Sequence, residues 1–150
     1  MNTQHQLFPR QIFRAYDIRG KVSFLNAHVV NAIANGLAKQ FIEYGQDTLV
    51  LGYDARLTSP SYARILKTVF EANKIKVIEI GCCSTPQMYF AAREVGGNGI
   101  MVTASHNPKE DNGIKWIVNA EPPTPEMIQA VGDFAELEFY KNNQIEIVED

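Results

Sequence analysis

The sequence has few cysteines and histidines and no long apolar run. Its two cysteines, Cys82 and Cys83, are adjacent, which excludes a disulfide framework and a zinc site built from separated cysteine pairs. We expect them to pack near the end of a strand. The three histidines, His5 in an expected frayed tail, His28 and His106, are scattered and indicate no metal cluster. No apolar run approaches the roughly 18 residues of a membrane span, and the amino terminus lacks a signal-peptide pattern, so we expect a cytoplasmic protein without a membrane partner.

An excess of positive charge is also lacking. The net charge of −3, from 14 Lys and Arg against 17 Asp and Glu, creates no long-range field that would attract nucleic acid or an anionic membrane. Any anion that the protein binds must therefore be held by a local site. What the chain does have is 150 residues with 45% hydrophobic content, which is enough for one domain with an ordinary core.

Periodicity and capping residues predict four helices. Apolar residues recur at helical spacing from 26 to 44, with Asn26 as the amino-terminal cap and Gly45 at the carboxyl end. In each of three further helices, a capping oxygen precedes a proline at the first helical position. These helices are expected to begin at Ser59-Pro60, Thr85-Pro86 and Thr124-Pro125.

Short β-prone runs alternate with these helices, at residues 48–53 (TLVLGY), 76–80 (KVIEI), 99–103 (GIMVT) and 114–118 (IKWIV). Helical crossovers make the first three strands parallel, whereas the connection from Thr103 to Ile114 has no helix and permits an antiparallel return. We therefore expect an α/β fold, a three-layer α/β/α domain with a mixed, mostly parallel sheet of about four strands. The last residues, NNQIEIVED, have the polarity of a linker or of a strand that awaits a partner.

The carboxyl ends of the parallel strands define the rim where α/β proteins bind ligands. The loops on this rim are residues 52–59 (GYDARLTS), 81–85 (GCCST) and 103–108 (TASHNP). Ser105 lies in the third loop.

Two interpretations of Ser105 are open. Asn107-Pro108 and Asp111-Asn112-Gly113 are turn signals, and a serine in a turn commonly bonds a nearby backbone group. Alternatively, Ser105 carries a chemical group, which requires amides to receive an anion and a cation to neutralise it. Lys115 can supply that cation, because it lies at the start of the returning strand on the face opposite Trp116.

A nucleophilic serine suits either acyl or phosphoryl transfer. Acyl transfer needs a base and an orienting carboxylate next to the serine, and the sequence has no G-x-S-x-G elbow to present them. His106 directly follows Ser105, but this adjacency in a loop does not ensure that the imidazole can reach the serine hydroxyl. Phosphoryl transfer depends more on positioning and charge neutralisation, commonly with a divalent metal. Ser105, His106 and Lys115 suit phosphoryl transfer better.

Residues 13–20 (FRAYDIRG) also allow two interpretations. The run is strand material in which Asp17 pairs with Arg14 or Arg19 on the surface. Alternatively, Arg19 offers a planar fork to a phosphate and Tyr16 a hydroxyl to a sugar. Spacing alone does not decide between them.

Four motifs in this order, FRAYDIRG, GYDAR, the turn before Thr85-Pro86, and TASHNP followed by NGIK, resemble the first domain of the α-D-phosphohexomutases. The likeness is to the bacterial phosphomannomutase/phosphoglucomutase group, since phosphoglucosamine mutases usually have G-T-D-G-[IV]-R-G in place of YDIRG. It covers nearly the whole chain and assigns residues 1–139 to the catalytic-serine domain and 140–150 to an inter-domain boundary segment.

The resemblance implies reversible transfer of a phosphoryl group between the 1- and 6-positions of a hexose phosphate. Ser105 would be the phosphoserine, and one of its phosphate oxygens would help bind Mg²⁺. Glucose 1,6-bisphosphate, or mannose 1,6-bisphosphate, would be the intermediate that restores the phosphoserine.

The same resemblance assigns roles around Ser105. Lys115 would act as general acid/base, with His106 and Arg19 assisting proton transfer or charge stabilisation. Tyr16 would face the sugar together with Arg19 and Lys115, and Asn107 would shape the serine loop.

The sequence departs from the family pattern in two ways. Relatives normally have three further domains, with a D-G-D-x-D-R metal loop, a G-E-x-S-G-H sugar loop and a phosphate-binding loop, and these 150 residues contain none of them. We therefore expect a fragment that needs the remaining domains and has little or no activity alone, or else a non-catalytic phosphate-binding or assembly module with the same fold. In GYDAR, Tyr53 replaces a frequent arginine, which leaves Arg56 as the main cation of that loop, with an expected structural role.

Overall fold

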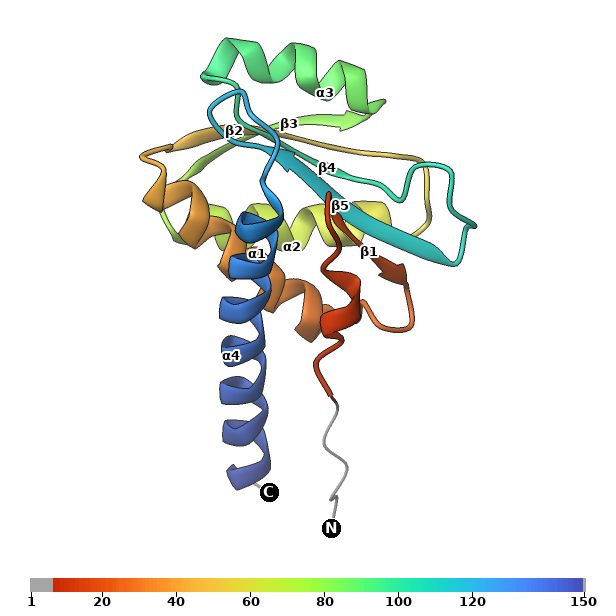
Figure 1. Ribbon diagram of the computed structural model, residues 1–150, viewed down its shortest axis with the longest axis vertical. Coiled ribbons are helices and arrows are strands. Elements are labelled where there is room, and N and C mark those ends of the chain that lie inside the picture. Colours follow the sequence, from red (N-terminus) through yellow and green to blue (C-terminus); the bar gives the residue numbers. More distant parts are fainter. Residues whose placement is uncertain (1–6, 150) are drawn as a thin grey trace.

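The fold is described by a computed structural model that covers residues 7–149, so His5 lies outside the described residues. The elements, coloured along the chain in Figure 1, are η1 (Arg10–Ile12), β1 (Ile18–Lys21), α1 (Ala27–Glu43), β2 (Thr48–Tyr53), α2 (Ser59–Ala72), β3 (Lys76–Cys82), α3 (Thr85–Ala92), η2 (Arg93–Val95), β4 (Gly99–Val102), β5 (Asp111–Ile117) and α4 (Pro125–Glu149). No helix among residues 7–149 is both long and apolar enough to cross a bilayer.

The strands form one mixed sheet in the order β1-β5-β4-β2-β3. Strands β3, β2 and β4 are parallel, and β5 returns antiparallel to β4, as the lack of a helix between them predicts. The α/β fold with a mixed sheet is confirmed, with five strands rather than about four. The additional strand is β1, which has only four residues and pairs antiparallel with β5.

The pairing of β1 with β5 corrects one prediction from the sequence. Asp111-Asn112-Gly113 is not a turn but the first part of β5, opposite Arg19, Gly20 and Lys21. Gly113 is required there because a Cβ atom would collide with the backbone carbonyl oxygen of Ile18. This glycine therefore allows two strands to approach closely, which a sequence pattern does not distinguish from a turn.

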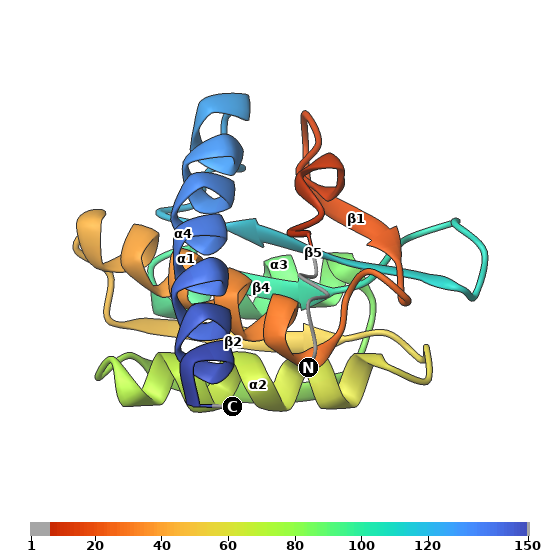
Figure 2. The ribbon, with the colours of Figure 1, turned by 90° about the horizontal axis from the view of Figure 1, so that it is seen from below.

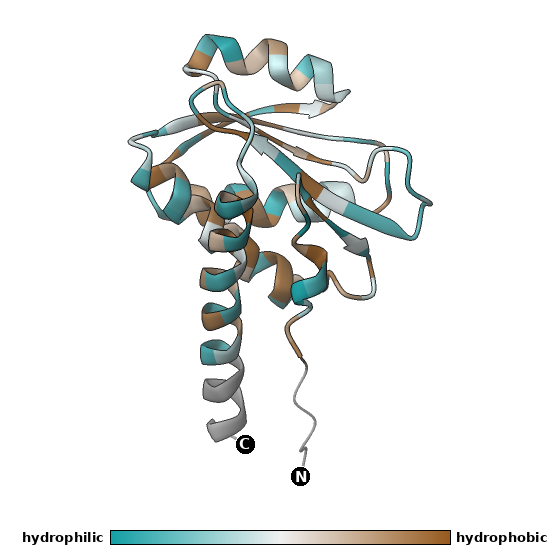
Figure 3. Cartoon of the chain, viewed as in Figure 1, coloured by the Kyte–Doolittle hydropathy of each residue, from teal (hydrophilic) through white to brown (hydrophobic). Residues whose placement is uncertain are grey.

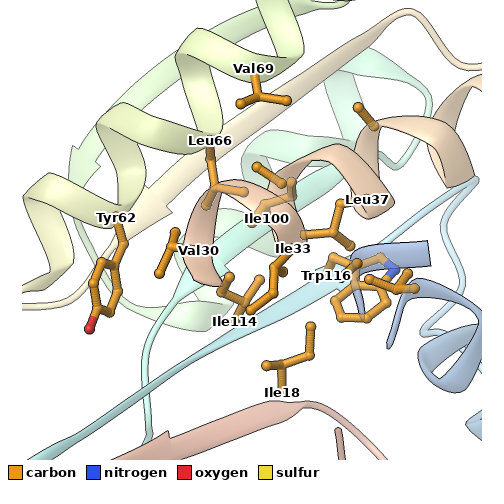
Figure 4. Close-up of a cluster of buried hydrophobic side chains, with 14 of the residues drawn as sticks. Ile18, Val30, Ile33, Leu37, Tyr62, Leu66, Val69, Ile100, Ile114 and Trp116 are labelled. Atoms are coloured by element: carbon orange, nitrogen blue, oxygen red, sulfur yellow. The ribbon is translucent and has the colours of Figure 1, made fainter. Parts of the chain in front are cut away.

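The sheet separates two hydrophobic layers of unequal size. Helices α1, α2 and α4 lie on one side of it and α3 on the other (Figures 1 and 2). In the larger layer, α1 packs between the sheet, α2 and α4, and Figure 4 shows Ile33 and Leu37 of α1 beside Ile100, Ile114 and Trp116 of the sheet. The smaller layer is built around four buried residues, Val50, Met88, Ala92 and Met101.

Capping is as predicted at two of the four helices. The side chain of Asn26 accepts a hydrogen bond from the amide of Val29 at 3.0 Å, and that of Thr124 accepts one from the amide of Met127 at 3.1 Å. At α3 the cap is Ser84 and not Thr85, because Ser84 forms a reciprocal capping box with Gln87. At α2 the N-cap residue is Thr58, without a side-chain capping bond, and Ser59 has a different role described below.

The end of the chain also differs from the prediction. Residues 142–149 were expected as a linker or a strand, but α4 continues through them to Glu149. After Gly132, no glycine or proline interrupts the sequence, so nothing in it terminates the helix begun at Pro125. Residue 139 therefore coincides with no break in secondary structure, and the boundary between 139 and 140 stays a prediction.

The two cysteines differ in environment. Cys83 packs near the end of β3, as predicted, with its Sγ atom 3.9 Å from the Sδ atom of Met101. Cys82 is the last residue of β3 and is exposed, so the prediction that it packs is wrong. Consecutive residues at a strand end point to opposite sides, which allows only one of the pair to face the small core.

Candidate functional site

The loop between β4 and β5 lies at one end of the sheet, where it forms the right-hand edge of Figure 1. It follows the carboxyl end of β4, and the loop between β2 and α2 reaches the same rim. Figure 3 shows mainly hydrophilic residues along the β4–β5 loop and into the first part of β5. Ser105, His106 and Asn107 belong to this loop, which we call the serine loop (residues 103–110).

Ser105 combines features of both interpretations drawn from the sequence. Its backbone takes a left-handed conformation with φ of +56°, and its amide donates to Oγ1 of Thr103 at 2.9 Å, as in a turn. Its hydroxyl does not serve the turn. Instead, Lys115 Nζ donates to Ser105 Oγ at 3.3 Å, and the serine is exposed to solvent. The turn therefore presents the hydroxyl to a cation on an open surface.

Lys115 reaches Ser105 because of its place in β5. It pairs with Met101 of β4, while its neighbour Trp116 is 2% exposed in the main core. The alternation of a strand therefore directs Lys115 to the opposite face, as the sequence predicts. Trp116 is itself fixed by a hydrogen bond from its indole nitrogen to Gln40 of α1 at 3.0 Å, which anchors the strand that carries the lysine.

Arg19 approaches the serine loop from β1. Its Nε and Nη2 atoms donate to Oδ2 of Asp17 at 3.1 and 2.6 Å, and its Nη1 donates to Oδ1 of Asn107 at 2.8 Å. The predicted partner of Asp17 is therefore confirmed as Arg19, but Asp17 is only 5% exposed and does not lie on the surface. Within the described residues these bonds use three of the five N–H groups of the guanidinium, which leaves two for an anion.

Asn107 links the two sides of the loop. Besides accepting from Arg19, its side chain donates to Oδ2 of Asp111 at 2.8 Å, and its amide donates to the carbonyl oxygen of Ala104 at 3.0 Å. Through these contacts Asn107 connects Arg19, Asp111 and the loop backbone, and its role in shaping the loop for a reaction stays a prediction.

Tyr16 and His106 are both on the surface. Tyr16 is 83% exposed in the segment before β1, and His106 is exposed directly after Ser105. Neither side chain takes part in the hydrogen bonds that fix the described serine loop. Both side chains are therefore accessible to a ligand that arrives from solvent.

The GYDAR loop supplies a second arginine. Arg56 donates to backbone carbonyl oxygens of the serine loop and to the carboxylate of Asp54, so its predicted structural role is confirmed. Tyr53, which replaces a frequent arginine of relatives, is half-buried against the main core. Neither the buried position of Asp17 nor the supporting role of Asp54 was predicted, although both residues occur in the motifs that identify the rim.

The residues near Ser105 do not form a metal site on their own. No cluster of three or more His, Cys, Asp or Glu side chains suitable for a metal occurs in the part of the chain that the structure describes. Asp17, Asp54 and Asp111 are already bonded to Arg19, Arg56 and Asn107. A phosphate on Ser105 would add one oxygen ligand, too few for the octahedral shell of Mg²⁺.

Residues 10–141 match the family model for phosphoglucomutase/phosphomannomutase, alpha/beta/alpha domain I. The chain belongs to this family. The resemblance found in the motifs is therefore confirmed, and the fold is that of a phosphohexomutase domain I. The chemical roles of Ser105, Lys115, His106, Arg19 and Tyr16 stay predictions.

Individual family members show how much of a phosphohexomutase this chain represents. It is 38% identical to the phosphoglucomutase of Neisseria meningitidis serogroup B over 122 residues, which are 80% of this chain and 26% of that protein. It is 36% identical to the phosphomannomutase/phosphoglucomutase of Pseudomonas aeruginosa over 125 residues, covering 82% and 27% of the two chains. A solved structure of a family protein from Burkholderia thailandensis superimposes with a TM-score of 0.79 at 31% identity, over 86% and 30% of the chains. The chain thus spans less than a third of the length of these relatives.

Proposed function

We propose that this chain is the catalytic-serine domain of an enzyme that interconverts hexose 1-phosphates and 6-phosphates. The observation that carries the proposal is the approach of Lys115 Nζ to within 3.3 Å of Ser105 Oγ on an open rim. Membership of the phosphohexomutase family supports it. Glucose and mannose phosphates are both candidate substrates, and the reaction takes place in the cytoplasm with further domains of a longer chain as partners.

In the proposed reaction, phosphorylated Ser105 gives its phosphoryl group to a free hydroxyl of a hexose monophosphate. A bond forms between the sugar oxygen and phosphorus, and the bond between phosphorus and Ser105 Oγ breaks. Lys115 gives a proton to the departing Oγ, the atom to which it donates in the structure, and recovers a proton from the attacking sugar hydroxyl. In the second step, Ser105 Oγ takes the phosphoryl group from the other position of the bisphosphorylated sugar. The bond between that phosphorus and the sugar oxygen breaks, a bond to Oγ forms, and Lys115 moves the proton in the opposite direction, which restores the phosphoserine and releases the isomeric monophosphate.

Cations near Ser105 stabilise the charge of the transferring group. The two uncommitted N–H groups of Arg19 can bind phosphate oxygens, and the exposed His106 can assist proton transfer. Tyr16 would contact the sugar. Mg²⁺ would bind a phosphate oxygen on Ser105 and neutralise charge, with its other ligands supplied from outside residues 7–149.

The proposal is tested by intact mass spectrometry of the purified chain before and after incubation with glucose 1,6-bisphosphate and Mg²⁺. We expect one added phosphoryl group, mapped to Ser105 by peptide analysis and absent in Ser105→Ala. If the chain stays unmodified, NMR titration with the bisphosphate is expected to shift the amides of Ser105 and His106. A chain that neither takes up phosphate nor shows these shifts would contradict the proposal and favour a non-catalytic assembly module.

A further inference from the structure

Arg56 uses all of its hydrogen-bond donors within the protein. A guanidinium has five N–H groups, one on Nε and two on each terminal nitrogen. The five acceptors are Oδ2 of Asp54 for Nε at 3.1 Å, the carbonyl oxygens of Pro108 and Asp111 for Nη1 at 2.7 and 3.2 Å, and those of Ser105 and Asn107 for Nη2 at 2.8 and 2.9 Å. Arg56 therefore has no N–H group left for a phosphate, in contrast to Arg19.

Four of these acceptors come from a single short stretch of backbone. The carbonyls of residues 105, 107, 108 and 111 converge on one planar group, so the stretch must bend around Arg56. A lysine cannot replace this arrangement, because an ammonium group has three donors and lacks the planar fork. The side chain of Arg56 is 13% exposed, so these bonds are largely shielded from water.

The bend includes the left-handed backbone of Ser105, which has φ of +56°. A residue other than glycine keeps this conformation only where its surroundings determine it. Both backbone polar groups of Ser105 are held by side chains, its carbonyl by Arg56 at 2.8 Å and its amide by Thr103 at 2.9 Å. Arg56 is thus one of two side chains that maintain the backbone from which the hydroxyl faces Lys115.

Arg56 is itself anchored through Asp54. The Asp54 carboxylate also accepts from the hydroxyl of Ser59 at 2.7 Å, and the fully buried Asn112 donates to that hydroxyl at 3.0 Å. Partial burial by itself raises the pKa of Asp54, but hydrogen bonds from Ser59, Thr103 and Arg56 outweigh it and lower the pKa below its usual range. A charged Asp54 therefore ties Arg56 to both α2 and β5.

We infer that Arg56 is a positioning residue for phosphoryl transfer at Ser105. It fixes the bend that presents the serine hydroxyl to Lys115, and it binds no phosphate itself. This inference rests on the proposed function of Ser105 as the carrier of the phosphoryl group. The part that concerns loop shape, however, is measurable on the chain without any reaction.

The test compares Arg56→Lys with Arg93→Lys, a matched change at an exposed arginine that lies over the ring of Phe90. Circular dichroism first establishes that both variants are folded. Hydrogen exchange by NMR is then expected to be at least about tenfold faster at the amides of Asn107 and Asp111 in Arg56→Lys, and unchanged in Arg93→Lys. Unchanged exchange in folded Arg56→Lys would overturn the inference.

A second variant, Arg56→Ala, tests the guanidinium group directly. Added ethylguanidinium is expected to restore slow exchange at the same amides, whereas ethylammonium is not. Equal effects of the two cations would contradict the role of the planar fork. If this variant does not fold, the exchange result for Arg56→Lys decides alone.

Phosphorylation kinetics separate positioning from phosphate binding. At saturating glucose 1,6-bisphosphate, we expect Arg56→Lys to lower the rate of Ser105 phosphorylation by about 100-fold, with less than about threefold change in the half-saturating concentration. A large rise in that concentration would instead identify Arg56 as a phosphate ligand. If the wild-type chain takes up no phosphate and shows no amide shifts with the bisphosphate, the proposed function is contradicted, and the exchange experiment still decides the role of Arg56 in loop shape.

Discussion

At Ser105, an unusual backbone conformation and an accessible hydroxyl occur in the same residue. A left-handed conformation of this kind costs on the order of 1–3 kcal/mol outside glycine, and it persists where the surrounding structure determines it. Thr103 and Arg56 hold this conformation through hydrogen bonds to the amide and the carbonyl oxygen of Ser105, and Lys115 lies next to the hydroxyl. The conformational cost is therefore concentrated at the residue proposed to carry the chemistry.

The contact between Lys115 and Ser105 leads to a kinetic prediction. Lys115→Met keeps a long apolar stem in β5 but removes the proton carrier, so the rate of Ser105 phosphorylation should fall at least about 100-fold. Quenched-flow sampling with mass spectrometry measures this rate. Lys109→Met, at an exposed lysine in the same loop, is the control and should keep the wild-type rate. Equal rates in the two variants would show that Lys115 does not move the proton.

The lowered pKa of Asp54 leads to a prediction of how the free energy of unfolding changes with pH. A carboxyl group whose pKa is lower in the folded state stabilises the fold fully above its unfolded value of about 3.9. This contribution is lost as pH falls through the lower folded-state pKa. The free energy of unfolding, measured with urea from about pH 6 to about pH 2, should therefore decrease more steeply in the wild type than in Asp54→Asn.

The control for this experiment is Asp133→Asn, which replaces a mostly exposed carboxylate. Its pH dependence should resemble that of the wild type, since a surface ion pair contributes little. Parallel slopes for the wild type and Asp54→Asn would contradict the stabilising role of the charged Asp54.

How much of the site could be predicted depends on the residue. Ser105, Lys115 and Arg19 could be identified because their chemically versatile side chains stood in recognisable motifs, Ser105 in a loop and the two cations in strands. The burial of Asp17 could not, because it depends on the pairing of the four-residue strand β1 with β5. The buried strand position of Asn112 could not be predicted either, because Asp-Asn-Gly is a turn signal in sequence but part of β5 in the structure.

At the scale of elements, long periodic segments were predictable and their ends were less so. The helices after Asn26 and Thr124 begin where a single capping residue is available. Where two hydroxyl residues stand side by side, as in Ser84-Thr85, both can cap a helix, and the choice depends on the tertiary position of the chain. The strand β1 was not counted in the expected sheet, although residues 13–20 were recognised as possible strand material, because four residues give little room for an alternating pattern.

The close contact between α1 and α4 gives a prediction about helix packing. A Cβ atom at Gly36 would lie 2.9 Å from the backbone carbonyl oxygen of Val131. Gly36→Ala gains about 1 kcal/mol in helix propensity, but overpacking costs about 1–3 kcal/mol, so we expect a net loss of about 1 kcal/mol. Urea unfolding measures this loss as a lower midpoint with an unchanged slope.

The same substitution at Gly132 in α4 is the matched control. There the added Cβ atom would meet the guanidinium end of Arg10 at 3.0 Å, which is a flexible side chain rather than backbone. Gly132→Ala should therefore be less destabilising than Gly36→Ala. The opposite order would mean that the backbone contact with Val131 does not limit the packing of α1 on α4.

At the scale of the whole molecule, the two sides of the sheet are unequally covered. Helix α1 buries ten of its residues, whereas α3 buries only Met88 and Ala92 and leaves Phe90 69% exposed. Because local stability follows buried apolar contact, α3 should open more readily than α1. Amide hydrogen exchange is expected to be faster in the middle of α3 than in the middle of α1. Equal protection of the two helices would mean that the molecule opens only as a single unit.

The bonds from Arg56 to the serine loop also affect how such a protein can change during evolution. Four of its five partners are backbone carbonyls, which every amino acid carries. Substitutions at Pro108 or Lys109 can therefore alter the surface shown to a ligand without removing a partner of Arg56. The position of Arg56 itself has no such freedom, because another side chain cannot supply five donors in one plane. The side chains of the loop can thus change while its backbone keeps the same bend. New ligand preferences can therefore arise there by single substitutions.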